Sequence, residues 1–270
     1  MKRSGIITFV TDFGLTDAYT AMMKGVILRI NRKAQLVDIT NSINTGSIFQ
    51  AAGILKETYR YFPEGTVHMA VVDPGVGGKR KLMAFETENH FFVGPDNGLF
   101  WPILEKAVNP VVSELTEEKY FLEQVTKTFH GREIFAPVAA HISLGVEINQ
   151  LGPPLIDPVD LNMPHAYLSG NALLGEVIRV DNFGNIITNI SDKDLFGFVK
   201  NSTAVISLAD LKIEGISKIY NDAEEGELLA VINSSNLLEV AVNLGRASEY
   251  IGMEANEIIG TVVKVNRQDV

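Results

Sequence analysis

The chain lacks several of the residues and segments on which common protein functions depend. It contains no cysteine, which excludes disulfides, thiol nucleophiles and cysteine-ligated zinc. It has no run of about 20 apolar residues, so the sequence predicts no membrane-spanning helix. Its 23 Lys and Arg residues are outnumbered by 33 Asp and Glu, and this charge of −10 argues against a broad nucleic-acid or membrane surface. We therefore expect a cytoplasmic protein that binds neither nucleic acid nor membrane.

Proline is unevenly spread along the chain, and its distribution predicts the domain organisation. Four of the ten prolines fall between residues 151 and 169, and none follows. Because proline cannot donate a backbone hydrogen bond, such a stretch is typical of an extended linker. The sequence thus predicts an N-terminal domain over residues 1–152, a proline-rich linker over 153–170 and a C-terminal domain over 171–270. A long surface loop within one domain is the alternative.

The first domain alternates short apolar stretches with stretches of helical periodicity. Strands are expected at 5–10, 36–39, 67–72, 82–86 and 91–93, and helices at 17–31, 47–61 and 134–144. Thr16 or Asp17 is the expected cap of the first helix. This order predicts an α/β fold, with a mostly parallel sheet flanked by helices on both faces. In such sheets the ligand lies beyond the carboxyl ends of the strands.

The last hundred residues have a different pattern. Short β-branched segments separated by Gly, Asn or Asp predict strands at 175–180, 186–190, 203–207, 228–232, 237–242 and 258–265. Few helical patterns occur among them. We expect a smaller antiparallel domain here, barrel-like or a small sandwich.

Polar residues follow the expected strands of the first domain. Asp12 stands in TDFG after the first strand, where its carboxylate could accept two hydrogen bonds from a ribose diol or simply cap a turn. Asp73 follows the third strand, and Arg80 lies seven residues later, close enough to pair if the glycine-rich loop folds back. Such a pair could be structural or could orient a polar reactant. The loop glycines GVGG fit neither a dinucleotide nor a P-loop spacing.

His130 precedes a predicted helix, in the segment Thr128-Phe129-His130-Gly131-Arg132-Glu133. It could act in a site or only cap and pack the helix. The five histidines show no HxH or HExxH spacing, so no metal site is predicted. A GxSxG elbow is also absent, which argues against a serine hydrolase.

The second domain has candidate binding residues in its turns. Asp181 and Asn185 belong to DNFGN, a turn between two strands in which Gly184 suits a positive φ angle. Ser234 lies in another turn between two β segments. Tyr220 could stack on a ligand or be a surface aromatic. Taken singly, each of these segments is also explained as an ordinary turn.

Six ordered motifs are more specific together than any one alone: TDFG, VDPGVGG followed by Arg80, GPDNG, FHGREIFAP, DNFGNIITNI and VINSSNLLEVAVN. In this order they resemble the S-adenosylmethionine (SAM) hydroxide adenosyltransferase family, also called SAM hydrolases, which are related to the SAM-dependent fluorinase and chlorinase. The resemblance extends from residue 6 to about 245. It implies two domains, a homotrimer with active sites between subunits, and conversion of SAM and hydroxide to adenosine and L-methionine.

The resemblance also implies a role for each candidate residue. Asp73, Arg80 and His130 look like the catalytic set that positions and polarises water. Asp12 looks like the acceptor for the ribose diol, and Tyr220 like the aromatic that stacks on adenine. The remaining binding residues are Asp181 for the methionine ammonium, Asn185 for the adenine edge and Ser234 for the methionine carboxylate. The fluorinase pattern has Arg after this serine, whereas this chain has Ser235.

The implied reaction needs no cofactor, since the sulfonium leaves as a neutral thioether and SAM is itself the substrate. Two alternatives remain open at this point. A halogenase would use chloride as the nucleophile on the same scaffold, although the acidic Asp73 disfavours a nearby anion. A non-catalytic sensor would bind SAM or adenosine without turnover.

Overall fold

The computed structural model describes residues 1–252 and 255–268, which divide into two compact units, Met1–Met163 and Pro164–Val270. Residues 153–155 run beside the last strand of the first unit, where the backbone N–H of Glu114 donates to the Pro153 carbonyl at 2.9 Å. The first strand of the second unit begins at Tyr167. Each unit is described by itself below.

The first unit is built on a six-stranded sheet in the order β2-β1-β3-β5-β4-β6. Its strands are β1 (Ile6–Thr11), β2 (Gln35–Thr40), β3 (Val67–Val71), β4 (Leu82–Glu86), β5 (Phe91–Pro95) and β6 (Val111–Glu114). The pairs β1–β2, β1–β3 and β3–β5 are parallel, whereas β4 pairs antiparallel with β5 and β6. The predicted mostly parallel sheet is confirmed, and β6 is an additional edge strand.

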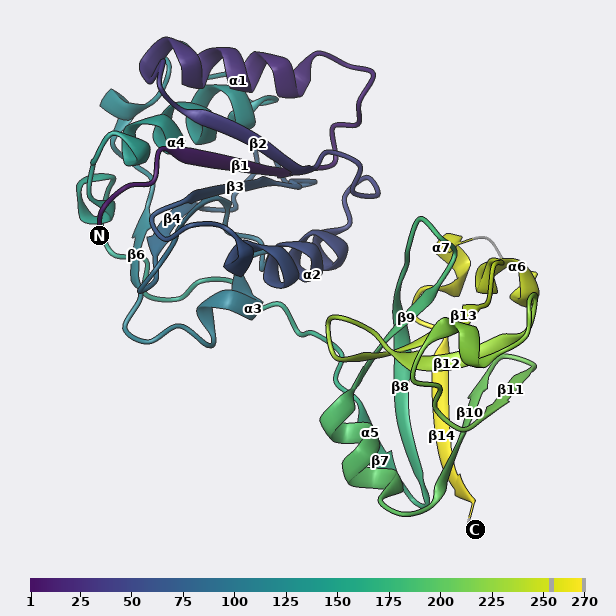
Figure 1. Cartoon of the computed structure of the whole chain (residues 1–270). Helices are drawn as coiled ribbons and strands as arrows, with labels where there is room; N and C mark the ends of the chain where they lie inside the picture. Colours follow the sequence, from purple (N-terminus) through teal and green to yellow (C-terminus); the bar gives the residue numbers. More distant parts are fainter. Residues whose placement is uncertain (253–254, 269–270) are drawn as a thin grey trace. The chain divides into compact units, whose positions relative to one another are not determined.

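Helices cover both faces of this sheet, as predicted (Figure 1). One face carries α1 (Tyr19–Ile30) and α4 (Ala136–Ser143), and the other carries α2 (Ile48–Thr58) and α3 (Trp101–Leu104). Short 3₁₀ turns follow or link them: η1 (Tyr59–Tyr61), η2 (Glu118–Tyr120) and η4 (Ile148–Gln150). Two apolar cores result, one on each face, because strands buried on both sides are apolar throughout.

The helix ends differ in how they are capped. Ser47 accepts the backbone N–H of Gln50 and caps α2. The expected cap of α1 by Thr16 or Asp17 is wrong, because Ala18 occupies the cap position and no side-chain hydrogen bond is made there. A π-helical turn, η3 (Gly131–Phe135), replaces the start of the predicted helix at 134 and runs directly into α4.

The second unit is an antiparallel sheet in the order β11-β10-β14-β8-β9-β13-β12, with β7 paired to β8. Its strands are β7 (Tyr167–Ser169), β8 (Ala172–Val180), β9 (Ile186–Ser191), β10 (Thr203–Leu208), β11 (Leu211–Glu214), β12 (Leu228–Ile232), β13 (Leu237–Val242) and β14 (Val262–Gln268). A bridge between Ser217 and Val231 brings the segment after β11 to β12, so the sheet is nearly closed. The predicted barrel-like domain is confirmed.

Short helices complete this unit: α5 (Asp192–Val199), α6 (Ala247–Ile251), α7 (Ala255–Ile258) and the 3₁₀ turn η5 (Tyr220–Asp222). The helix α5 was not predicted; it packs Leu195, Phe198 and Val199 against the core of the barrel. Within residues 1–252 and 255–268, no helix is both long and apolar enough to cross a lipid bilayer.

Candidate functional site

A cavity of about 550 Å³ opens at the carboxyl ends of β1 and β3. These strands are parallel neighbours, and Thr11 of one is paired with Val71 of the other. Both strands therefore end at the same edge of the sheet, which brings Asp12 and Asp73 to one cavity. His130, which immediately precedes the π-helical turn η3, lines the same cavity.

Arg80 connects two of these residues. Its guanidinium donates from Nε to both oxygens of Asp73 at 2.9 Å and from Nη2 to Oδ2 at 2.5 Å. The same Nη2 lies 2.9 Å from Nδ1 of His130. The Asp73 and Arg80 side chains are only 5% and 10% exposed, so the ion pair is largely screened from water. The loop after β3 thus folds back as the seven-residue spacing required.

The guanidinium fixes the protonation of the His130 ring. Arginine is always a donor, so Nδ1 of His130 must accept, and the ring hydrogen lies on Nε2. Burial and the charge of Arg80 lower the pKa of His130, while Asp73 partly opposes them. A neutral imidazole with an Nε2–H group is therefore the form present at neutral pH. In this form His130 donates a hydrogen bond and does not act as a base.

Part of the cavity wall is formed by three aromatic rings. Phe13, Tyr19 and Phe129 pack together with ring centroids 5.3–5.7 Å apart, and all three line the cavity. The Asp12 carboxylate accepts the backbone N–H of Gly46 at 2.9 Å, which fixes its orientation beside them. The cavity thus joins an aromatic wall of tilted and edge-to-face rings to a charged, hydrogen-bonded edge.

In the second unit, Asp181 and Asn185 form one hydrogen-bonded turn between β8 and β9. Oδ1 of Asp181 accepts the backbone N–H groups of Phe183 and Asn185, at 2.8 and 2.9 Å, and Oδ2 lies 3.2 Å from the Asn185 amide nitrogen. Gly184 in this turn has φ +83°, and a Cβ there would lie 2.7 Å from that of Arg246. The turn is therefore a fixed structure that presents both polar side chains together.

A buried carboxylate near this turn organises two further candidates. Glu239 on β13 is 3% exposed, and its Oε1 accepts the Tyr220 hydroxyl at 2.8 Å while Oε2 lies 3.2 Å from the Asn233 amide nitrogen. Burial raises the pKa of Glu239, and the charge of nearby Asp181 raises it further. Burial, followed by the hydrogen bond to Glu239, raises the pKa of Tyr220 to about 12. Asp181, Tyr220 and Glu239 thus form one electrostatically coupled cluster with two carboxyl groups.

The turn that carries Ser234 depends on the same carboxylate. Oδ1 of Asn233 accepts the backbone N–H groups of Ser235 and Leu237, at 2.9 and 3.1 Å. Because Glu239 holds the amide nitrogen of Asn233, the amide oxygen is turned toward these donors. Ser234 itself is exposed at the tip.

The structure therefore gathers the eight candidates into two groups, one in each unit. Asp12, Asp73 and His130 line the strand-end cavity, and Arg80 is bonded to the last two. Asp181, Asn185, Tyr220 and the Ser234 turn lie in the barrel-like unit. Glu239 was missed. Its signal was a single charged residue inside the otherwise apolar strand LLEVAV, on the face opposite the core residues Leu238, Val240 and Val242.

The fold and these groups define a class: an α/β sheet with a polar cavity at its strand ends, followed in the same chain by a barrel-like β unit. Comparison with known sequences narrows the class. Residues 7–152 match the SAM hydroxide adenosyltransferase N-terminal domain, and residues 175–259 match the corresponding C-terminal domain. The chain belongs to this family.

Several relatives are similar over nearly their whole length. The chain is 35% identical to an (R)-S-adenosyl-L-methionine hydrolase of Salinispora arenicola, with 94% of this chain and 96% of the relative covered. It is 34% identical to a protein of the same name from Methanocaldococcus jannaschii, with 92% of each covered. A fluorinase of Nocardia brasiliensis is 25% identical, over 97% of this chain and 98% of the relative. A solved structure from Thermotoga maritima, an uncharacterized conserved protein, has a TM-score of 0.89 at 33% identity, covering 97% of this chain and all of its own.

Proposed function

We propose that the protein hydrolyses SAM to adenosine and L-methionine by attack of hydroxide or water on C5′. The observation that carries this proposal is the Arg80 guanidinium held between Asp73 and a neutral His130 at the strand-end cavity. The family of the chain and the hydrolase names of its relatives point to the same reaction.

This reaction requires an aligned nucleophile and does not require a general acid to protonate the leaving group. When oxygen bonds to C5′, the C5′–S bond breaks with its electron pair going to sulfur, so the leaving methionine is neutral and needs no proton. Attack of hydroxide on a sulfonium removes both charges, and a site that excludes water favours such a step. Holding the two reactants in line supplies the remaining advantage.

Arg80 and His130 supply what a bound hydroxide requires. Both present N–H donors, and the guanidinium charge favours the ionised form of a nearby water. Asp73 orients Arg80 and, by pairing with it, keeps it from binding a halide as a lone cation would. The catalytic roles of Asp73, Arg80 and His130 are thus to position and polarise the nucleophile.

The binding roles follow the chemistry of the substrate. Asp12 accepts the ribose diol, and Tyr220 stacks on the adenine, whose edge Asn185 reads. Asp181 pairs with the methionine ammonium, and Ser234 binds the carboxylate. The acidic group around Asp181 and Glu239 also suits a ligand that carries a sulfonium cation.

The protein acts in the cytoplasm as a homotrimer without a metal or redox cofactor, in this proposal. Each active site combines the first unit of one subunit with the second unit of its neighbour, as the family resemblance implies. The two groups of candidate residues, one in each unit, support such an arrangement.

Incubation of the pure protein with SAM tests the reaction. Adenosine and L-methionine should appear in equal amounts, and Asp73→Ala should remove turnover while leaving adenosine binding nearly unchanged. Formation of 5′-chloro-5′-deoxyadenosine in chloride would indicate a halogenase instead. Tight SAM binding with no product would indicate a sensor.

A further inference from the structure

A second cavity, of about 390 Å³, lies at the other end of the first unit's sheet, away from the strand-end site. Its wall includes the 87–90 turn between β4 and β5 and the 3₁₀ turn after α2. The strands β3 and β5 begin here, at Val67 and Phe91, whereas Asp12 and Asp73 follow the far ends of β1 and β3. The cavity shares no residue with the proposed catalytic site.

A buried chain of three polar side chains ends in this cavity. Thr8 Oγ1 lies 2.8 Å from His68 Nδ1, and His68 Nε2 lies 3.2 Å from His90 Nδ1. Thr8 and His68 are fully buried, and His90, which lines the cavity, is 5% exposed. Burial lowers the pKa of His68 to about 3 and also lowers that of His90, so both rings are neutral.

Thr8 sets the donor-to-acceptor direction of these two hydrogen bonds. A fully buried hydroxyl must donate its hydrogen, and in the described part of the protein its partner is His68 Nδ1. His68 then carries its hydrogen on Nε2 and donates to His90 Nδ1. This leaves His90, whose side chain lines the cavity, with an Nε2–H group. The buried chain thus offers the cavity a donor of fixed direction.

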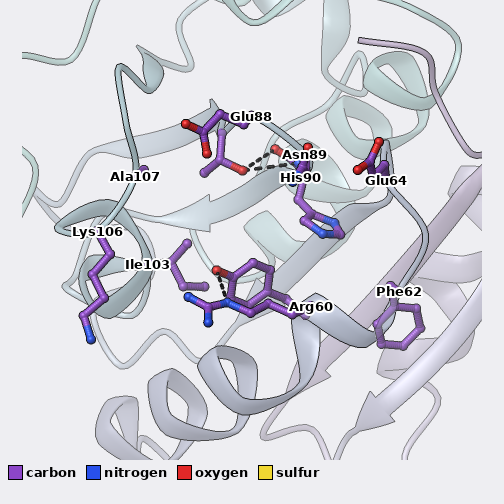
Figure 2. A pocket seen from close by; sticks show the side chains of 11 residues that line it. Arg60, Phe62, Glu64, Glu88, Asn89, His90, Ile103, Lys106 and Ala107 are labelled. Carbon is purple, nitrogen blue, oxygen red and sulfur yellow. Dashed lines mark hydrogen bonds between the residues drawn. The ribbon is translucent and has the colours of Figure 1, made fainter.

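The charged side chains around this donor are balanced and separated. Glu64 and Glu88 lie on one side of the cavity, and Arg60 and Lys106 on the other (Figure 2). The Arg60 guanidinium is steadied by its Nε donating to the Tyr59 hydroxyl at 2.8 Å. The Tyr59 ring and Ile103 add apolar surface to the cavity wall.

We infer that this cavity binds the zwitterion of an α-amino acid with an apolar side chain. His90 Nε2–H, Arg60 and Lys106 receive the carboxylate, Glu64 and Glu88 receive the ammonium, and the side chain lies against Tyr59 and Ile103. A simple anion such as phosphate fits less well, because the two glutamates repel it while they complement a zwitterion. The volume is within the range of small-ligand pockets, at its lower end.

Nitrogen NMR of histidine rings in ¹⁵N-histidine-labelled protein tests the site. L-Leucine is the probe, because it is not a product of the proposed reaction. Before addition, His68 and His90 should both be neutral with the hydrogen on Nε2. L-Leucine should then shift the His90 Nε2–H signal in a saturable way, and 4-methylpentanoate, 3-methylbutylamine and phosphate should each bind more weakly.

Exposed variants separate binding from folding. Lys106→Met and Glu88→Gln should each weaken L-leucine binding by about 5- to 10-fold, the effect of losing one charge-assisted contact. Lys264→Met on β14 removes an exposed lysine in the other unit and should leave binding unchanged. The inference is overturned if L-leucine leaves His90 unshifted, if phosphate binds more tightly, or if His90 carries its hydrogen on Nδ1.

Discussion

Arg80 uses two guanidinium nitrogens at once, and lysine cannot replace it. Nε and Nη2 hold Asp73 while Nη2 also reaches His130. A lysine ammonium is a point charge without the planar fork, so one of the two partners would be released. Arg80→Lys should lower kcat for SAM hydrolysis by roughly 100-fold, the effect of a misplaced reactant, with little change in KM.

Steady-state kinetics with adenosine detection measures this effect. Arg29→Lys, at an exposed position on α1, is the matched control and should behave as the wild type. An unchanged kcat in Arg80→Lys would show that the forked geometry is not needed.

Glu239 orients two proposed binding groups with its two oxygens, so its replacement by glutamine is informative. The glutamine amide nitrogen can donate to the Tyr220 oxygen but not to the Asn233 amide nitrogen, which is itself a donor. Glu239→Gln therefore reverses the bond to Tyr220, and Tyr220→Phe removes it. Each should raise KM for SAM by roughly 3- to 10-fold, the value of one hydrogen bond, with kcat within about twofold.

The control for this pair is Glu225→Gln, which changes an exposed glutamate in the same unit. Thermal unfolding checks that the variants fold. If KM stays constant while kcat falls, Glu239 acts in some way other than by positioning Tyr220.

At the scale of elements, the turn between β8 and β9 depends on the backbone conformation of one glycine. Gly184 has φ +83° and no room for a Cβ. Gly184→Ala should destabilise the protein by about 1–3 kcal/mol, the cost of holding a non-glycine residue in that conformation. Gly197→Ala in α5, where the φ angle is ordinary and the space open, should stabilise it by about 0.5–1 kcal/mol.

Urea unfolding of the two variants gives the comparison directly. Equal effects of the same sign at both glycines would mean that the positive φ angle of Gly184 carries no cost.

Local pattern predicted most of the elements, and its failures have physical causes. The parallel strands β1, β3 and β5 were predictable because they are buried on both faces and are mostly apolar. The helix α5 was not, since its eight residues include Gly197 and two aromatics and its stability comes from packing on the barrel. The cap of α1 failed because the chain enters that helix at Ala18 without a side-chain hydrogen bond.

The candidate site residues also divide into those that the sequence predicts and those that it does not. Asp12 and Asp73 were predictable, since parallel neighbours end at one edge of a sheet. The bond between Arg80 and His130 joins residues 50 positions apart and depends on two loops folding together. The role of Glu239 depends on the register of β13 against two turns, which no local pattern contains.

At the scale of the whole molecule, the free energy of unfolding should decrease as the pH falls below about 6.5, the ordinary pKa of a histidine side chain. Burial lowers the pKa of His68 to about 3 and lowers those of His90, His130 and His141. The unfolded chain then takes up protons that the folded protein does not. Each such histidine costs ~1.4 kcal/mol per pH unit until the pH reaches its folded pKa.

Urea unfolding between pH 7 and pH 5 measures this slope. His141→Gln should reduce it, because one of the four histidines is gone, while His165→Gln at an exposed position should not. A slope that His141→Gln leaves unchanged would show that the carboxylates dominate the acid instability.

The proposed assembly predicts that two inactive variants restore activity when they share a trimer. Asp73→Ala removes a residue of the first unit and Asp181→Ala one of the second. If each site joins the two units of different subunits around a cyclic trimer, every trimer that contains both variants has one intact site of its three. Co-expressed, doubly tagged trimers should therefore hydrolyse SAM, whereas mixtures of the separate homotrimers without subunit exchange should not. Inactive mixed trimers would place each site within one subunit.

The π-helical turn after His130 has a consequence for how such a site can change. The Ala136 N–H reaches back to the Gly131 carbonyl, five residues earlier, so this turn holds one residue more than an α-helical turn. One residue corresponds to about 100° of rotation in an α-helix. The extra residue therefore changes the rotation of His130 about the helix axis relative to α4. It sets the direction of the His130 imidazole while α4 keeps its packing against the sheet. Deleting one residue from this turn is therefore expected to re-aim His130, which we propose contacts the nucleophile, while α4 keeps its packing on the sheet.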